Sequence, residues 1–173
     1  MSDEPTAVRR AGFPPDYGSR GSTDDTTLPW DQVEQKLRDA PNYWLVTVTA
    51  GGRSHPRPVD GVWVDGALCF GGSPDTRWVR NLDRDPRATV HLPSGDDVVI
   101  LEGTAELVTD PAHPLADASQ AASRAKYPQY YGADATGSGH PEFSPFWVLR
   151  PDVAYAWTLA GFPNRATRWT FAR

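Results

Sequence analysis

The stretch SHPRPVDGVWVDGALCFGG at residues 54–72 decides the expected fold, because it contains two short strands joined by a tight turn. Asp65 and Gly66 form the turn, and an Asp-Gly pair between apolar runs is a strong hairpin signal, since both turn positions need a positive φ. Pro56 and Pro58 lack the amide hydrogen that a central strand donates, so part of the first strand is expected at an edge. The stretch therefore predicts an antiparallel β-hairpin.

Strand patterns continue on both sides of this hairpin. Upstream, YWLVTVT at 43–49 is rich in β-branched and aromatic residues, and AGGR follows it as a turn. Downstream, strands are expected at RATVHL (87–92), VVILEGTAELVT (98–109), FWVLRP (146–151), VAYAWT (153–158) and TRWTF (167–171). Seven or eight short antiparallel strands, with 17 prolines and 15 glycines in the chain, predict a mainly β protein built as a small closed or half-open barrel.

Three short helices are expected around these strands. The first spans TTLPWDQVEQKLRDAP (26–41), with a threonine cap, Pro29 in the first turn and Pro41 as the stop. The second lies in SPDTRWVRNLDRDP (73–86), and the third is alanine-rich and ends near Lys126. A glycine-rich loop follows at 132–140, for which a lid over a ligand site is one interpretation.

The length of 173 residues fits a single domain, since a second core would leave each half marginal. Residues 1–26 contain prolines, glycines and scattered charges without hydrophobic periodicity. Such a composition is typical of a segment that does not order itself alone. We therefore expect a flexible N-terminal tail at 1–26, or a strap across a partner, and one barrel domain at 27–173.

The charge and the single cysteine limit the possible functions. A net charge of −5 and a pI near 5.3 disfavour a protein that coats nucleic acid or acidic lipid. Cys69 has no partner, so a disulfide framework and a cysteine zinc site are both excluded, and a reducing compartment such as the cytoplasm is expected. The N-terminal residues lack a signal-peptide pattern, and no run of about 18 apolar residues predicts a membrane span.

The stretch GGSPDTRWVRNLDRDPR at 71–87 is the strongest candidate for chemistry. Glycines let the backbone approach a ligand just where a helix begins and where its first amides point outward, so the stretch predicts an anion site. Ser73 and Thr76 add hydroxyl donors. Three arginines recur at i, i+3 and i+7, so their guanidinium groups share one helix face and reach one phosphate or carboxylate: Arg77, Arg80 and Arg84. The alternative is an ordinary capped helix with a solvated arginine face.

A second candidate lies on the preceding strand. His55 and Arg57 stand beside backbone groups that two prolines free from sheet pairing, which suits the edge of a flat heterocycle. The alternative is an edge strand on which Arg57 pairs with Asp60 or Asp65 at the surface.

Other chemistries have weaker support in the sequence. Trp63, Trp78 and Trp169 are candidates to stack on a ligand ring, although core packing is the favoured interpretation. Cys69 is expected as a small buried hydrophobe rather than a nucleophile, and no G-x-S-x-G motif is present. No metal site is expected, because the four histidines are far apart and form no metal-binding motif: His55, His91, His113 and His140.

Taken together, these motifs resemble a known superfamily. The stretches at 44–72 and 143–158, with the run RNLxRDPRxxVHLxSGDDVVxxEG at 80–103, are similar to the pyridoxamine 5′-phosphate oxidase-like split-barrel proteins that bind FMN or related cofactors. The similarity is greatest to the actinobacterial branch that uses the deazaflavin F420, and it covers residues 30–172 in order. The resemblance implies a six-stranded split β-barrel with short helices, paired into a homodimer with two equivalent cofactor clefts at the subunit interface.

The resemblance also implies where the cofactor binds. It places the phosphate at the start of the second helix and the ring along the strand before the Asp-Gly turn, near the end of the strand that follows it. With Ser73 and Arg80 from the anion site, the expected cofactor-binding residues are Arg57, Pro58, Val59, Gly71, Gly72, Ser73, Thr76, Arg77, Trp78 and Arg80.

Two positions depart from the family pattern. Relatives commonly have a lysine where this chain has Trp78 and a tryptophan where it has Asp60. The loss of the lysine removes a charge-assisted contact worth about 1.5–3 kcal/mol. Arg77 and Arg80 are placed to compensate.

The resemblance implies an oxidoreductase that uses F420, or alternatively FMN, and transfers hydride to a small conjugated or heteroaromatic substrate. Because the cofactor ring itself carries the hydride, no catalytic side chain is expected. The alternative is a non-catalytic module that binds FMN, haem or a related ring in the same interface cleft. Pyridoxamine 5′-phosphate oxidation itself is less favoured, since ATRWTFAR at 166–173 lacks that enzyme's C-terminal substrate pattern.

Overall fold

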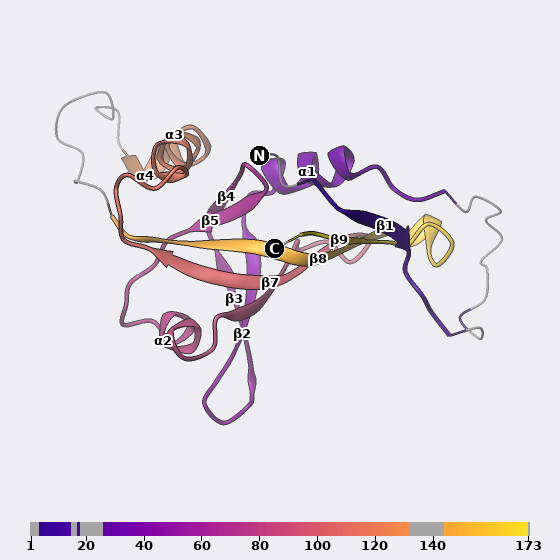
Figure 1. Ribbon diagram of the computed structural model, residues 1–173, viewed down its shortest axis with the longest axis horizontal. Helices are drawn as coiled ribbons and strands as arrows, with labels where there is room; N and C mark the ends of the chain where they lie inside the picture. Colours follow the sequence, from indigo (N-terminus) through magenta and orange to yellow (C-terminus); the bar gives the residue numbers. More distant parts are fainter. Residues whose placement is uncertain (1–3, 15–16, 18–25, 132–143, 173) are drawn as a thin grey trace.

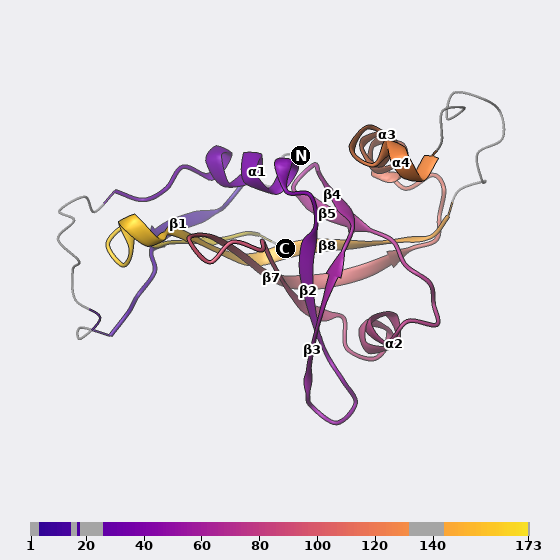
Figure 2. The same ribbon diagram turned by 180° about the vertical axis from the view of Figure 1, so that it is seen from behind.

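The computed structural model describes residues 4–14, 17, 26–131 and 144–172, in which short helices surround an antiparallel sheet (Figures 1 and 2). The strands are β1 (Ala7–Arg10), β2 (Tyr43–Val48), β3 (Ser54–Val59), β4 (Gly61–Val64), β5 (Ala67–Phe70), β6 (Arg87–His91), β7 (Asp97–Val108), β8 (Phe146–Thr158) and β9 (Thr167–Thr170). The helices are α1 (Trp30–Asp39), α2 (Arg77–Arg84), α3 (Ala116–Lys126), the short α4 (Pro128–Tyr131) and a 3₁₀ turn at Leu159–Gly161. Within the described ranges no helix is both long and apolar enough to span a membrane.

Six strands close into a barrel, which confirms the mainly β split-barrel prediction. Strand β2 pairs with β3 and β6, and the circuit continues from β6 through β7, β8 and β5 to β4. Strand β3 leads directly into β4 through Asp60, so the two act as one bent strand that closes the circuit. Every one of these pairs is antiparallel.

The barrel splits along one edge of β8. The first part of β8, up to Leu149, pairs with β5, whereas the part from Val153 onward pairs with β9. Between them the register with β7 shifts at Gly103, which lies opposite Pro151. A side chain at Gly103 would place its Cβ 2.1 Å from the carbonyl oxygen of Arg150, so the bulge requires glycine. The two strands expected at 146–158 are therefore one strand with an irregularity.

The helices cover the barrel from two sides. Helices α1 and α3 pack on β4 at one side, and α2 packs on β2 at the other (Figures 1 and 2). Val33 and Leu37 of α1 are buried with Leu45, Val90 and other barrel residues in the main core. A second, smaller core lies beneath α3 and consists of Val62, Ala67, Cys69, Val108, Leu115, Tyr127 and Val148.

The local sequence signals predicted the Asp65-Gly66 turn correctly, but they misplaced the start of helix α1. Asp65 and Gly66 have φ values of 46° and 73°, which confirms the hairpin turn. Helix α1, by contrast, begins at Trp30 behind Pro29, without a side-chain cap, so the expected threonine cap was wrong. The amide of Leu28 donates to Thr167 Oγ1 at 2.8 Å, which holds the preceding segment against β9 and delays the helix.

Part of the segment expected as a tail joins the sheet. Residues 7–10 form β1 and pair with β9 of the same chain, from Ala7 opposite Thr170 to Arg10 opposite Thr167. Such an edge pairing depends on backbone hydrogen bonds and needs no apolar pattern, which explains why periodicity did not reveal it. Residues 1–3, 15–16 and 18–25 of that segment, and the glycine-rich loop at 132–140, lie outside the described residues.

Candidate anion site at the start of helix α2

Helix α2 begins with open backbone amides. Its N-cap residue, Thr76, has an extended backbone, and no side chain caps the first turn. The Thr76 hydroxyl instead donates to the carbonyl oxygen of Ser73 at 2.8 Å. Because the first amides of an α-helix have no acceptor within the helix, this end of α2 is suited to a negatively charged group.

A buried hydrogen bond places α2 against strand β2, the pairing partner of β3. Asn81 Nδ2 donates to Thr47 Oγ1 at 2.9 Å, and both residues are buried. Thr47 lies opposite His55 in the register of β2 with β3, and Leu45 lies opposite Arg57. Since directly paired residues share a face of the sheet, His55 and Arg57 project on the face against which α2 packs.

The charges of two arginines act on one histidine at this place. The pKa of His55 is lowered from 6.5, first by partial burial and then by the positive charges of Arg77 and Arg57. Both guanidinium charges therefore act on the same imidazole, although Arg57 lies on β3 and Arg77 on α2. Arg57 and Arg77 are exposed, and neither forms a hydrogen bond or an ion pair with any described residue. We call His55, Arg57, Thr76 and Arg77 the anion site.

The other two arginines of α2 have structural partners. Arg80 Nη1 donates to the carbonyl oxygen of Asp75 at 2.6 Å, and Arg84 donates to that of Val48. Of the three arginines expected to share one anion, only Arg77 is without a partner among the described residues. Helical spacing places the three arginines on one face of α2, but it does not reveal which backbone carbonyl oxygens lie next to that face.

Trp78 follows Arg77 of the anion site and is buried in the core. It is 6% exposed and packs against Phe70 and Trp147, with ring centroids 5.6 and 6.4 Å away. A Cβ at Gly72 would lie 2.1 Å from the Trp78 indole, whereas one at Gly71 would meet nothing within 4 Å. The backbone at Gly71 is therefore approachable, and the indole lies in the core.

The remaining candidate positions divide between core and surface. Val59 is buried, whereas Pro58 and Ser73 are exposed. Trp63 and Trp169 are buried in the core, which confirms that these two tryptophans serve in packing. Cys69 is 3% exposed and burial raises its pKa to about 12, which confirms a buried hydrophobe. No group of three or more histidine, cysteine or acidic side chains in the described part of the chain is arranged to hold a metal.

One protein-family model matches most of this chain. The model of pyridoxamine 5′-phosphate oxidase matches residues 29–160, which include the barrel from α1 to the end of β8 and the whole anion site. The chain belongs to the pyridoxamine 5′-phosphate oxidase family. The superfamily resemblance of the sequence is thereby confirmed.

Several solved structures share the fold of this oxidase-family chain. A conserved hypothetical protein of Mycobacterium tuberculosis has 19% identity and a TM-score of 0.64, over 78% of this chain and 87% of that one. A haem-binding protein of Mycobacterium smegmatis has 23% identity and a TM-score of 0.60, over 84% of this chain but 59% of that one. An F420 reductase has 18% identity and a TM-score of 0.50, over 69% and 94%. Among curated protein sequences, none matches the chain.

A cavity of about 320 Å³ lies beneath α3 in this oxidase-family barrel, and none of the four anion-site residues lines it. It lies between the bend that joins β3 to β4, the end of β5, helix α3 and the start of β8. Gly71, a member of the expected cofactor-binding set, lines it, and so does Asp60, which follows Val59 of that set. The cavity therefore shares Gly71 with the expected cofactor site.

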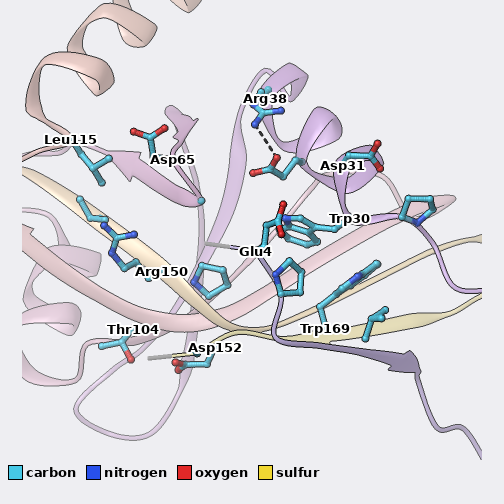
Figure 3. Close-up of a pocket in the computed structure, with 18 of the residues that line it drawn as sticks. Glu4, Trp30, Asp31, Arg38, Asp65, Thr104, Leu115, Arg150, Asp152 and Trp169 are labelled. Atoms are coloured by element: carbon cyan, nitrogen blue, oxygen red, sulfur yellow. Dashed lines mark hydrogen bonds and ion pairs between the residues drawn. The ribbon is translucent and has the colours of Figure 1, made fainter. Parts of the chain in front are cut away.

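A larger groove of about 1390 Å³ lies at the split of the oxidase-family barrel (Figure 3). Figure 3 shows its wall of charged side chains, including Asp31 and Arg38 of α1 and Arg150 and Asp152 of β8. None of the four anion-site residues lines it. Trp169 does, but with 1% of its surface exposed it offers no free ring face.

A polar network at Gly61 was not predicted from the sequence. Gly61 donates its amide to Tyr127 Oη at 3.0 Å, and Lys126 Nζ donates to the Gly61 carbonyl oxygen at 2.8 Å. The Tyr127 hydroxyl lies 2.8 Å from that same oxygen and 3.0 Å from the carbonyl oxygen of Pro41, and donates to one of them. Lys126 and Tyr127 are about 65 positions from Gly61, so no local pattern identifies the contact.

Proposed function

We propose that this protein is an oxidoreductase that binds F420, or alternatively FMN, and transfers hydride to a small conjugated or heteroaromatic substrate. The observation that carries the proposal is that the charges of two exposed arginines, Arg57 and Arg77, both act on His55, and that Arg77 begins the uncapped helix α2. Membership of the pyridoxamine 5′-phosphate oxidase family and the similarity to an F420 reductase support a flavin-type cofactor.

The residues present fit the phosphate of such a cofactor. Two exposed guanidinium groups and the open amides of α2 supply charge-assisted donors from two directions. The acidic tail of the deazaflavin gains more from these charges than FMN does, which favours F420. Arg80 and Ser73 stand at the edge of the site and contribute through donors that their structural contacts leave free.

When bound, the ring supplies the hydride. The chain would supply position and shielding: the strand from Arg57 to Val59 and the backbone at Gly71 and Gly72 would flank the ring, and the buried rings of Trp78 and Phe70 would support that surface from the core. No side chain of this chain needs to act as a general acid or base for that transfer.

A second candidate function follows from Trp78. Its indole fills the core at the position where relatives commonly have a cationic lysine, so the site has one phosphate contact fewer. A weakened phosphate site favours a module that binds FMN, haem or a related ring without turnover. The fold shared with a haem-binding protein of Mycobacterium smegmatis supports this alternative.

We further propose that two copies pair through the outer face of the barrel. Trp44, His91, Ile100 and Tyr155 follow one another across β2, β6, β7 and β8 in register, and all are half-exposed. The Trp44 and His91 rings are parallel within 2°, with centroids 6.2 Å apart. A continuous row of this kind is typical of an interface between identical subunits.

The first test is a titration of the purified protein with F420 and, separately, with FMN, followed by quenching of cofactor fluorescence. Saturation by one cofactor at one per subunit supports the oxidoreductase, and oxidation of the reduced cofactor by an enone or nitroheterocycle then establishes turnover. Saturation without turnover favours the binding module. No binding of either cofactor up to about 100 μM contradicts the oxidoreductase proposal.

A further inference from the structure

The cavity beneath α3 has one charged side chain in its described lining. Among the described residues that line it, Asp60 is the only one with a formal charge. The rest of the lining is apolar or carries neutral hydroxyl and amide groups, with Cys69 and Phe70 each 3% exposed on one side and Phe146 on another. A ligand in this cavity therefore meets apolar surface, neutral hydroxyl and amide groups, and one carboxylate.

Asp60 is available to such a ligand. Its side chain is exposed and forms no hydrogen bond or ion pair with any described residue. Its charge acts on Lys126, raising the pKa of that group against the larger effect of burial. The Lys126 ammonium, however, is held by the Gly61 carbonyl oxygen at 2.8 Å and by Tyr43 Oη at 3.1 Å. The carboxylate thus retains its hydrogen-bonding capacity.

The volume of the cavity restricts what fits. At about 30 Å³ for each water-sized group in a liquid, a cavity of about 320 Å³ holds roughly ten such groups. That is the size of one substituted ring and is too small for a whole flavin or deazaflavin nucleotide. The cavity is lined by Gly71 of the expected cofactor-binding set and by Asp60, which follows Val59 of that set, so it meets the expected cofactor site at these two positions.

We propose that this cavity is the substrate pocket and that Asp60 selects a substrate with one ring and a cationic or N–H-donating nitrogen. The inference rests on the proposed function, because the cofactor ring gives the pocket its reactive side. A carboxylate that receives a charge-assisted hydrogen bond discriminates such a nitrogen from a neutral oxygen by about 10- to 100-fold in affinity.

The test uses benzylamine and benzyl alcohol, which have nearly the same shape and differ in charge. Binding of each to the full chain is measured by amide chemical-shift changes in nuclear magnetic resonance, with and without the cofactor. The variants are Asp60→Asn, which removes the charge at constant shape, and Asp65→Asn as the matched control. Asp65 lies on the β4–β5 turn outside the cavity, and asparagine tolerates its positive φ.

Support requires three results: at least tenfold tighter binding of benzylamine to the wild type, loss of that preference in Asp60→Asn alone, and shifts at Gly71 and along α3. Equal binding of the two probes, or a preference that survives Asp60→Asn, overturns the proposal. Cofactor titration of the same samples tests the proposed function separately. A protein that binds F420 but shows no Asp60-dependent preference retains its function and loses this pocket assignment.

Discussion

Lys126 donates from Nζ to the carbonyl oxygen of Gly61 at 2.8 Å, and this contact joins the end of α3 to the point where β3 becomes β4. The same ammonium group lies 4.7 Å above the Tyr43 ring. Burial is the largest influence on Lys126 and lowers its pKa to about 8, against the opposing charges of Asp60 and Asp39. The bend that closes the barrel is therefore held by a cation that is costly to keep charged.

We expect the stability of the protein to rise with pH above about 8 because of Lys126. Between the folded pKa of about 8 and the ordinary value of 10.5, the unfolded chain binds more protons than the folded one, so deprotonation favours folding. The slope stays below about 1.4 kcal/mol per pH unit, because Lys126 is only half-buried and partly screened. Urea unfolding at pH 8, 9 and 10 measures it.

The variant Lys126→Met provides the comparison for that slope. Burial raises the pKa values of Tyr43 and Tyr127, but both proteins contain these groups, and their effect cancels in the difference. The stability of the wild type relative to the variant should increase with pH. A difference that stays constant from pH 8 to 10 would count against a depressed pKa at Lys126.

Tyr127→Phe should destabilise the fold by about 1–3 kcal/mol, because it leaves the buried amide of Gly61 without its acceptor. Tyr130→Phe is the matched control on the neighbouring helix, since Tyr130 is 64% exposed. Its cost should stay within about 0.5 kcal/mol. Urea denaturation of both variants tests the prediction, and equal costs would show that the hydroxyl network does not hold the bend.

Gly103→Ala should destabilise the barrel by about 1–3 kcal/mol or more, because the new Cβ would overlap the carbonyl oxygen of Arg150. Gly95→Ala is the control, since its Cβ would meet no atom within 4 Å. Thermal unfolding followed by circular dichroism compares the two. A Gly103→Ala protein as stable as Gly95→Ala would mean that β8 moves away at no cost.

Pairing through the outer face predicts that Ile100→Lys yields monomers. The residue lies in the middle of the row from Trp44 to Tyr155, where a buried lysine would have no partner. Leu159→Lys, at an apolar position that is 51% exposed in the 3₁₀ turn, should leave the assembly unchanged. Light scattering during size-exclusion chromatography gives the mass of each. A wild-type monomer would refute the pairing.

The sequence predicted the elements whose signals are local. The Asp65-Gly66 turn follows from backbone sterics, and α2 follows from its stop at Asp85-Pro86 and its apolar spacing. Contacts between distant segments were not predictable in this way. Gly61 contacts Tyr127 because the chain bends at Asp60 from β3, which pairs with β2, into β4, which pairs with β5. Arg80 and Arg84 contact the backbone carbonyls of Asp75 and Val48, which helical periodicity does not identify.

For the candidate site, the sequence identified the residue types but not all of their roles. Arg57 and Arg77 were both expected, and the charges of both act on the His55 imidazole, while the bond between Asn81 and Thr47 holds α2 against β2. Trp78 was expected at the phosphate through the family alignment, whereas its side chain is part of the core. An alignment position specifies a place along the chain, and packing decides which way a side chain of different size points.

Replacement of either exposed arginine should weaken cofactor binding. Arg57→Gln and Arg77→Gln each remove a charge-assisted donor, so the Kd for F420 should rise about 10- to 100-fold. Arg84→Gln is the control, because its guanidinium group is bonded to the Val48 carbonyl oxygen, and its Kd should change by less than about threefold. If all three variants bind as the wild type does, the phosphate lies elsewhere.

His55 should make the affinity for the cofactor depend on pH. In the free protein its pKa is below 6.5, by partial burial and by the charges of Arg77 and Arg57, so the imidazole is mainly neutral at pH 7. A bound phosphate brings negative charge and raises that pKa, so binding takes up a proton and affinity should increase as the pH falls below about 6.5. Fluorescence titrations with F420 from pH 7.5 to pH 5.5 measure this dependence, and His55→Gln should abolish it while leaving the affinity at the higher pH nearly unchanged. An equal pH dependence in the variant would place the titrating group outside the anion site.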